Sequence, residues 1–156
     1  MKLINPLIIL RILSTIMLIE ALSFLVCLPL AFFYNEPVSP FLWSSLITGL
    51  CYAVLGSLSI KADTNKFSSR DTFLIVTMAW LLIALFGSLP YLISKTIPSF
   101  INAFFESASG FTTTGASILK EVESLPYSIL FWRSLTHWIG GLGIIVLVIL
   151  ILPSLN

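Results

Sequence analysis

Four long apolar runs separated by short polar segments dominate the hydrophobic pattern of this chain. The runs cover about residues 12–34, 41–60, 72–94 and 127–152. Each has about 20 residues or more, which is the length that an α-helix needs to cross the roughly 30 Å hydrocarbon core of a bilayer. Turn-forming residues between the runs, such as NEPVSP at 35–40, favour breaks between helices. The pattern therefore predicts an all-α integral membrane protein with four transmembrane helices.

The segment 98–117, PSFINAFFESASGFTTTGAS, does not fit a plain membrane span. Pro98 or Ser99 can begin a helix there, and Gly110 can end it. Apolar side chains recur within it at helical spacing, with polar residues between them, at Phe100, Ile101, Phe104, Phe105 and Ala108. About a dozen residues at 1.5 Å each cover roughly 18 Å, which is too short to cross the membrane. We therefore expect a re-entrant pore helix at about 98–110 that enters the membrane and turns back.

The residues that follow this helix are Thr112, Thr113, Thr114 and Gly115. β-Branched Thr favours extended backbone, and Gly permits a conformation that other residues resist. Non-helical backbone at membrane depth occurs only where protein buries it or where it lines a water-filled cavity. Carbonyl and hydroxyl oxygens around such a cavity replace the hydration shell of a monovalent cation, as in potassium filters. We interpret 112–116 as an extended filter strand whose Thr residues and Gly bind the cation; an extramembrane turn after a short surface helix is the alternative.

The segments FFESASGFTTTGAS at 104–117 and WRSLTHWIGGLGIIVL at 132–147 carry the most specific sequence signal. They resemble the Trk/Ktr potassium-uptake family, and TrkH-type membrane subunits in particular. The resemblance implies two leading helices at 1–61, followed at 72–152 by a helix, a pore loop and a second helix, the first of four repeats around one pore. It also implies potassium uptake, a homodimer, and a cytosolic nucleotide-binding regulatory subunit as partner.

The chain holds one repeat where that family has four, and one filter strand cannot surround an ion. We therefore expect the N-terminal part of a longer protein whose remaining three repeats complete the pore. A single-repeat subunit of an oligomeric cation channel is an alternative. A non-conducting membrane module whose helices serve only assembly is another, although such a module has no need of the Thr-Gly segment 112–116 inside the membrane.

The distribution of basic residues predicts the orientation of the chain in the membrane. The polar loop 61–71 carries Lys61, Lys66 and Arg70, and two more basic residues, Lys2 and Arg11, precede the first run or lie at its start. The positive-inside rule places both regions in the cytoplasm. The pore loop then enters the inner (cytoplasmic) membrane from the extracytoplasmic side, where we expect a potassium filter.

Four ionisable side chains fall within or beside apolar segments. Glu106 of the pore helix and Arg133 of the last run share the outer half of the membrane, and a buried carboxylate is costly unless it is paired. Either the two form an ion pair that supports the filter, or Arg133 reaches the interface and Glu106 accepts hydrogen bonds from backbone amides. Glu20 lies near the middle of the first run, where we favour a structural role. His137, one helical turn from Arg133, fits no metal site.

Composition agrees with a membrane protein, since charged residues make up 10% of the chain and the mean hydropathy is +1.06. A net charge of +1 without a basic run argues against nucleic-acid binding. Cys27 and Cys51 lack the spacing of metal ligands. Gly140, Gly141 and Gly143 give a small-residue surface for a neighbouring helix and do not form a nucleotide-binding loop. Because the motifs of hydrolytic enzymes are absent from the sequence, we expect no enzymatic activity, no cofactor and no metal except transported potassium.

Overall fold

The computed structural model describes residues 5–60 and 69–151, and every regular element within them is helical. The helices are α1 (Pro6–Val26), α2 (Leu28–Phe33), α3 (Ser39–Leu58), α4 (Ser69–Gly87), α5 (Leu89–Ile93), α6 (Phe100–Phe111) and α7 (Tyr127–Ile151). A short 3₁₀ turn, η1 (Val122–Ser124), lies between α6 and α7. The all-α fold that the apolar runs predict is therefore confirmed for the described residues.

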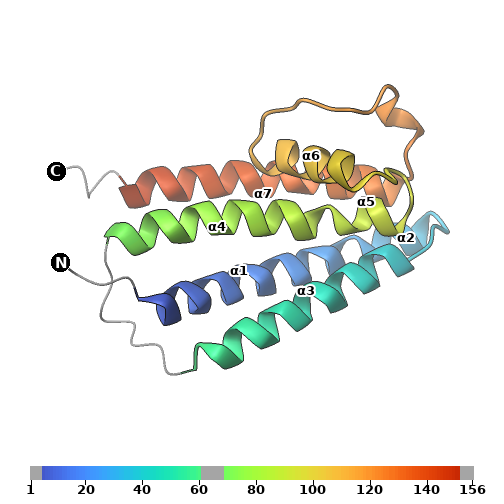
Figure 1. Cartoon of the computed structure of the whole chain (residues 1–156). Helices are drawn as coiled ribbons and strands as arrows, with labels where there is room; N and C mark the ends of the chain where they lie inside the picture. The colour runs from blue at the N-terminus through green and yellow to red at the C-terminus, as the bar shows by residue number, and fades with distance from the viewer. Residues whose placement is uncertain (1–4, 61–68, 152–156) are drawn as a thin grey trace.

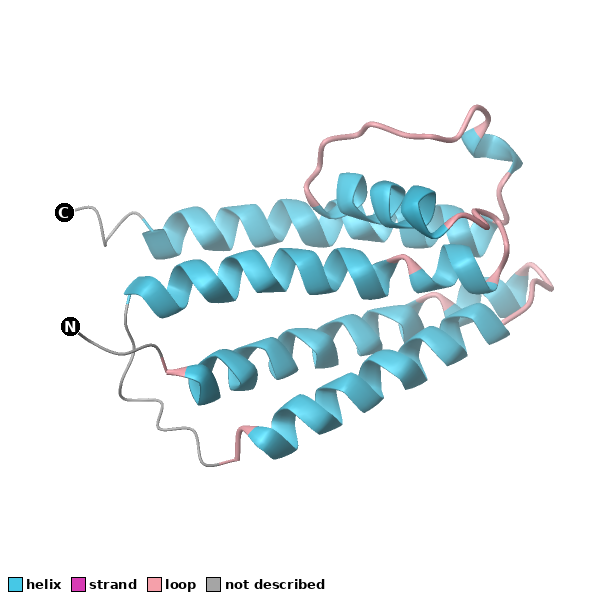
Figure 2. Ribbon diagram, viewed as in Figure 1, coloured by secondary structure: helices cyan, strands magenta, loops and turns pink. Residues whose placement is uncertain are grey.

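The long helices lie side by side, and α6 lies beside them as a separate short helix (Figure 1). α1 packs along α3 and α4, whereas α6 packs against α4 and α7. The start of α1 and the end of α7 are at the same end of the bundle, and α6 lies toward the opposite end. Figure 2 shows the long loop that leaves α6, arches over it and returns to α7. This arrangement keeps α6 and its loop away from both ends of the described chain.

Among the described residues, three helical stretches are long and apolar enough to cross a membrane: Pro6–Phe33, Ser39–Leu58 and Asp71–Ile93. They correspond to the first three apolar runs of the sequence. The first stretch is interrupted at Cys27, two residues before Pro29. The third is interrupted at Ser88, two residues before Pro90. Pro cannot donate a helical hydrogen bond and its ring crowds the preceding turn, which accounts for both breaks.

The core lies where α1, α3, α5, α6 and α7 meet, and aromatic side chains fill much of it. The buried Trp132 ring of α7 lies 4.5 Å from the Phe24 ring and 6.2 Å from the Phe111 ring, measured between centroids. The indole nitrogen of Trp132 donates a 3.0 Å hydrogen bond to the carbonyl oxygen of Gly87 at the end of α4. A Cβ at Gly87 would lie 2.5 Å from the Phe111 ring, so a side chain there would prevent this packing. The last turn of α6 is thereby fixed between α4 and α7.

The polar face of α6 is directed toward the other helices, and its apolar face is directed away from them. Glu106 and Ser107 are buried, whereas Phe100, Ile101 and Phe105 are exposed. An amphipathic helix on a soluble protein has the opposite arrangement, because its apolar face covers the core. The apolar stripe expected for this helix therefore exists, but α4 and α7 do not cover it.

Candidate functional site

The C-terminal turn of α6 is closed by backbone hydrogen bonds from the Thr run. The amide of Thr113 donates to the carbonyl oxygen of Gly110 at 3.0 Å. The amide of Thr114 donates to the carbonyl oxygen of Ser109, also at 3.0 Å. Thr113 has a φ of 56°, so this is a Schellman motif with Thr at the left-handed position that Gly usually occupies. The helix therefore ends at Phe111, one residue beyond the Gly that the sequence suggested as its end.

The segment 112–116 is irregular rather than a continuous extended strand. Thr113 has left-handed backbone, so the predicted extended conformation is wrong at this residue. Gly115 has a φ of 77°, which confirms that it adopts a conformation unfavourable for residues with a Cβ. A Cβ at Gly115 would meet no atom within 4 Å, so the backbone conformation, and not lack of space, requires Gly there. The four residues from Thr112 to Gly115 are all exposed, and the hydroxyls of Thr112 and Thr114 lie 2.8 Å apart.

Side chains of α6 hold the loop where it leaves this segment. The hydroxyl of Ser117 lies 3.0 Å from each carboxylate oxygen of Glu106, and the Ile118 amide donates to Glu106 Oε2 at 3.1 Å. The hydroxyl of Ser109 donates to the carbonyl oxygen of Ala116 at 2.5 Å. The segment 112–116 is thus attached to α6 at both of its ends.

Arg133 of α7 is a further partner of Glu106. Its Nε lies 2.8 Å from Glu106 Oε1, as a hydrogen bond and an ion pair. The Glu106 side chain is 1% exposed and the Arg133 side chain 20%. A carboxylate buried to this extent is stable only with a positive partner and hydrogen-bond donors. The ion pair of one predicted alternative and the amide hydrogen bond of the other therefore occur together at Glu106.

Three other side chains that the sequence singled out, those of His137, Cys27 and Cys51, have no hydrogen bond or ion pair to Glu106 in the part of the chain that the structure describes. His137 Nδ1 lies 2.8 Å from the carbonyl oxygen of Arg133, one turn earlier in the same helix. Cys27 and Cys51 are free cysteines. Within residues 5–60 and 69–151, no group of three His, Cys, Asp or Glu side chains could hold a metal ion.

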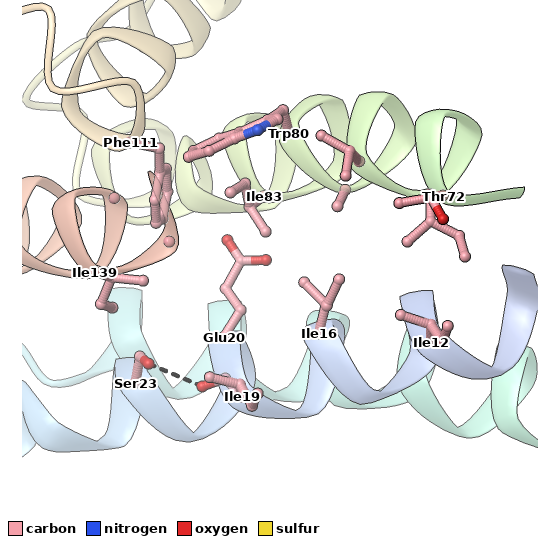
Figure 3. A pocket seen from close by; sticks show the side chains of 15 residues that line it. Ile12, Ile16, Ile19, Glu20, Ser23, Thr72, Trp80, Ile83, Phe111 and Ile139 are labelled. Carbon is pink, nitrogen blue, oxygen red and sulfur yellow. Dashed lines mark hydrogen bonds between the residues drawn. The ribbon is translucent and has the colours of Figure 1, made fainter. Parts of the chain in front are cut away.

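A cavity of about 460 Å³ lies between α1, α4 and α7 (Figure 3). Its lining is almost entirely apolar and includes Ile16 of α1, Ile83 of α4 and Phe111 of α6. The carboxylate of Glu20 points into this cavity. Neither of its oxygens has a hydrogen-bond partner in the part of the chain that the structure describes. The cavity therefore places an unpaired buried carboxyl group behind the end of α6.

Comparison with known proteins decides the family. The family model TrkH, described as "Cation transport protein", matches residues 43–156, which is more than half of the chain. The chain belongs to the TrkH family. The closed end of α6, the segment 112–116 and the contact between Glu106 and Arg133 are therefore features of a TrkH-family chain.

Curated TrkH proteins are similar to the chain over most of its length. The Trk system potassium uptake protein TrkH of Escherichia coli (strain K12) is 45% identical over 97 residues, which are 62% of this chain and 20% of that protein. TrkH of Vibrio parahaemolyticus is 36% identical over 150 residues, which are 95% of this chain and 31% of that protein. The crystal structure of the potassium transporter TrkH from Vibrio parahaemolyticus matches with a TM-score of 0.83 at 36% identity, over 93% of this chain and 31% of that one. The chain spans about a fifth to a third of the length of these TrkH proteins.

Sequence reasoning missed several contacts that shape this TrkH-family site. A Cβ at Gly140 would overlap the carbonyl oxygen of Phe111, so α7 crosses directly over the end of α6. The Gly residues of α7 indicated a close approach, but not which segment approaches. The carboxylate of Glu36 accepts hydrogen bonds of 2.7 and 2.9 Å from the first two amides of α7. These partners are 91 and 92 residues away in sequence, and no local pattern indicates the contact.

Proposed function

We propose that this chain is the N-terminal part of a TrkH-type subunit that takes up potassium across the cytoplasmic membrane. In this proposal, residues 1–61 supply two leading helices and residues 72–152 supply the first of four pore repeats. The stretches α1–α2, α3, α4–α5 and α7 are four spans, and α6 is the re-entrant pore helix. The complete protein is a cation-conducting subunit and not an enzyme.

The observation that carries the proposal is the attachment of the segment 112–115 to α6 at both of its ends. Hydrogen bonds close α6 before this segment, and Glu106 and Ser109 hold the loop after it. Non-helical backbone that is held in this way at membrane depth is the arrangement of a selectivity filter. The C-terminal end of α6, which carries partial negative charge, adjoins the segment and favours a cation there. We propose these four residues as this repeat's share of the potassium site, and Glu106 with Arg133 as its support.

The proposed orientation has the starts of α1 and α4 in the cytoplasm and α6 on the extracytoplasmic side. It is supported by the positive-inside rule, and three of the basic residues on which it depends, Lys2, Lys61 and Lys66, lie outside the described residues. The arrangement of the helices is compatible with it, since α6 lies toward the end of the bundle opposite to the starts of α1 and α4 (Figure 1).

The proposed partners follow from what one repeat lacks. One filter segment cannot surround an ion, and the apolar stripe of α6 is exposed in this chain. We propose that the remaining repeats of a longer protein, together with membrane lipid, cover this stripe. A homodimer and a cytosolic nucleotide-binding regulatory subunit are further proposed partners, supported by the resemblance to the Trk system.

Potassium uptake by the full-length gene product tests the proposal. The protein is produced in a bacterium that lacks its own potassium-uptake systems, and growth at low potassium and potassium influx are measured. We expect uptake by the wild type and impaired or unselective uptake by Gly115→Val. Gly49→Ala is the control, because a Cβ at Gly49 of α3 would meet no atom within 4 Å. A wild-type protein that reaches the membrane in normal amounts but moves no cation would support the assembly-module alternative.

A further inference from the structure

Glu20 of α1 and Ser107 of α6 are two buried polar groups that the proposed filter does not use. Their exposed fractions are 4% and 0%. Neither the carboxylate oxygens of Glu20 nor the hydroxyl of Ser107 has a hydrogen-bond partner within the described residues. A buried polar group without a partner is costly, and a buried charge more so. If two such groups lie close together, a hydrogen bond between them reduces the free-energy cost of burying each one.

Gly87 of α4 brings these two groups to the same point. A Cβ at Gly87 would lie 2.7 Å from Ser107 Oγ and 3.3 Å from Glu20 Oε1. Both oxygens therefore lie beside the same position, which a side chain of α4 would otherwise fill. Oxygens this close to one point come within reach of each other through a side-chain rotation or a bridging water. The Phe111 ring lies against the same point, so the connection would lie directly behind the last residue of α6.

We propose that Glu20 is an uncharged hydrogen-bonding group that links α1 to Ser107 and thereby positions the end of the pore helix. The proposal rests on the proposed function of 112–115 as a filter. The described side chains that line the cavity around Glu20 include no Lys, Arg or His, and no second acidic residue. A charged carboxylate there would have no counter-ion, whereas a neutral carboxyl group needs only one hydrogen-bonding partner. Ser107 is that partner.

The link gives the first leading helix a role in the pore. Ser107 lies one helical turn before Phe111, which directly precedes the filter residue Thr112. Glu20 contacts no filter residue in the structure, so it is a positioning residue that acts through α6. When the link is removed, the end of α6 is held only from α4 and α7, and the filter segment is less constrained.

The test uses the full-length protein and three substitutions, Glu20→Gln, Glu20→Leu and Ser107→Ala. Gln keeps the size and hydrogen-bonding capacity of a neutral carboxyl group, whereas Leu removes the polar group. We expect Glu20→Gln to keep the wild-type ratio of potassium to sodium uptake. Glu20→Leu and Ser107→Ala should each lower this ratio by up to about fivefold, the equivalent of one hydrogen bond. The double variant Glu20→Leu/Ser107→Ala should lower the ratio of potassium to sodium uptake little further than either single substitution does.

A matched control is Ser14→Ala, which removes another buried hydroxyl of α1. The Ser14 hydroxyl donates to the carbonyl oxygen of Arg11 within its own helix. The effect of Ser14→Ala on the uptake ratio should therefore simply add to the effect of Ser107→Ala. Additive effects of Glu20→Leu and Ser107→Ala would overturn the link. It would also be overturned if Glu20→Gln were as impaired as Glu20→Leu at equal amounts of folded protein, since the charge would then be required.

Infrared spectroscopy of the purified wild-type protein gives a readout that does not depend on transport. We expect the carbonyl stretch of a neutral carboxylic acid that is missing in Glu20→Gln and shifted in Ser107→Ala. The absence of such a band would contradict the proposal. A wild-type protein that moves no potassium refutes the proposed filter function. If the wild type transports normally and the Glu20 variants keep its ratio of potassium to sodium uptake, only the link is refuted.

Discussion

Gly140→Ala should displace the end of α6, and the structure indicates by how much. A Cβ at Gly140 would overlap the carbonyl oxygen of Phe111 and lie 2.7 Å from its carbonyl carbon and 2.9 Å from its Cα. Non-bonded carbon atoms prefer a separation of roughly 3.5–4.0 Å, so α6 and α7 would have to move apart by about 1 Å. Because the obstructing atoms are backbone, no side-chain rotation relieves the overlap.

The neighbouring substitution Gly141→Ala provides the reference for the magnitude. A Cβ at Gly141 would lie 4.0 Å from the nearest atom, Thr113 Cγ2, which is an ordinary contact. Both substitutions gain roughly 1 kcal/mol of helix propensity, so this contribution cancels when the two variants are compared. Overpacking costs about 1–3 kcal/mol. We therefore expect Gly140→Ala to be less stable than Gly141→Ala by about 1–3 kcal/mol.

Thermal denaturation of the full-length protein in detergent and potassium uptake by cells measure the two consequences. Gly140→Ala should denature at a lower temperature and discriminate less between potassium and sodium, because Phe111 directly precedes the proposed filter. Gly141→Ala should remain close to wild type in both assays. Equal behaviour of the two variants would refute the reasoning, since the approach of α7 to α6 would then not depend on Gly140.

Three further predictions concern the segment 112–115 and its support. Gly115→Ala should weaken the preference for potassium over sodium, because a φ of 77° is costly for any residue with a Cβ; wild-type selectivity in an ion-competition assay would contradict this. In a double-mutant cycle on stability, the effects of Arg133→Ala and Glu106→Gln should be strongly non-additive, because each substitution removes the 2.8 Å ion pair. Additive effects would show that the ion pair contributes little to stability. Thr113→Gly should stabilise the closed end of α6 by up to about 1 kcal/mol in thermal denaturation, because it removes left-handed strain; a loss of stability would show that the Thr side chain contributes more than the strain costs.

The long helices and the short α6 could be predicted because length limits what an apolar segment can do in a membrane. The contact between Glu106 and Arg133 could be anticipated only as one of two alternatives, since a buried carboxylate requires a partner and either a basic residue or backbone amides could serve. The donors Ser117 and Ile118 could not be identified in the same way. Any polar group of the loop could have served, and only the folded path of the loop selects these two.

The backbone at Thr113 could not be predicted, because residue type argues against a positive φ there. Tertiary contacts outweigh this preference. Phe111 is fixed between Gly87 on one side and Gly140 on the other, so α6 must end at that point. The chain then closes the helix with whichever residue comes next, and two backbone hydrogen bonds compensate for the strain at Thr113. A sequence pattern records neither constraint, because each arises from helices distant in the chain.

The inward polar face of α6 is the reverse of that of an amphipathic surface helix, and it favours the proposed role of α6 as support of a filter. A surface helix would leave its carboxylate in water, where Glu106 would have no need of Arg133. Here the polar side chains of α6 are attachment points: Glu106 and Ser109 hold the loop, and Ser107 faces the leading helix α1. The outer face is free to be apolar, because lipid or further repeats, and not water, are its proposed surroundings. The helix is too short to cross the membrane, its buried side carries acidic and hydroxyl side chains, and Thr and Gly follow its end. These features favour a cation filter on physical grounds that do not depend on family resemblance.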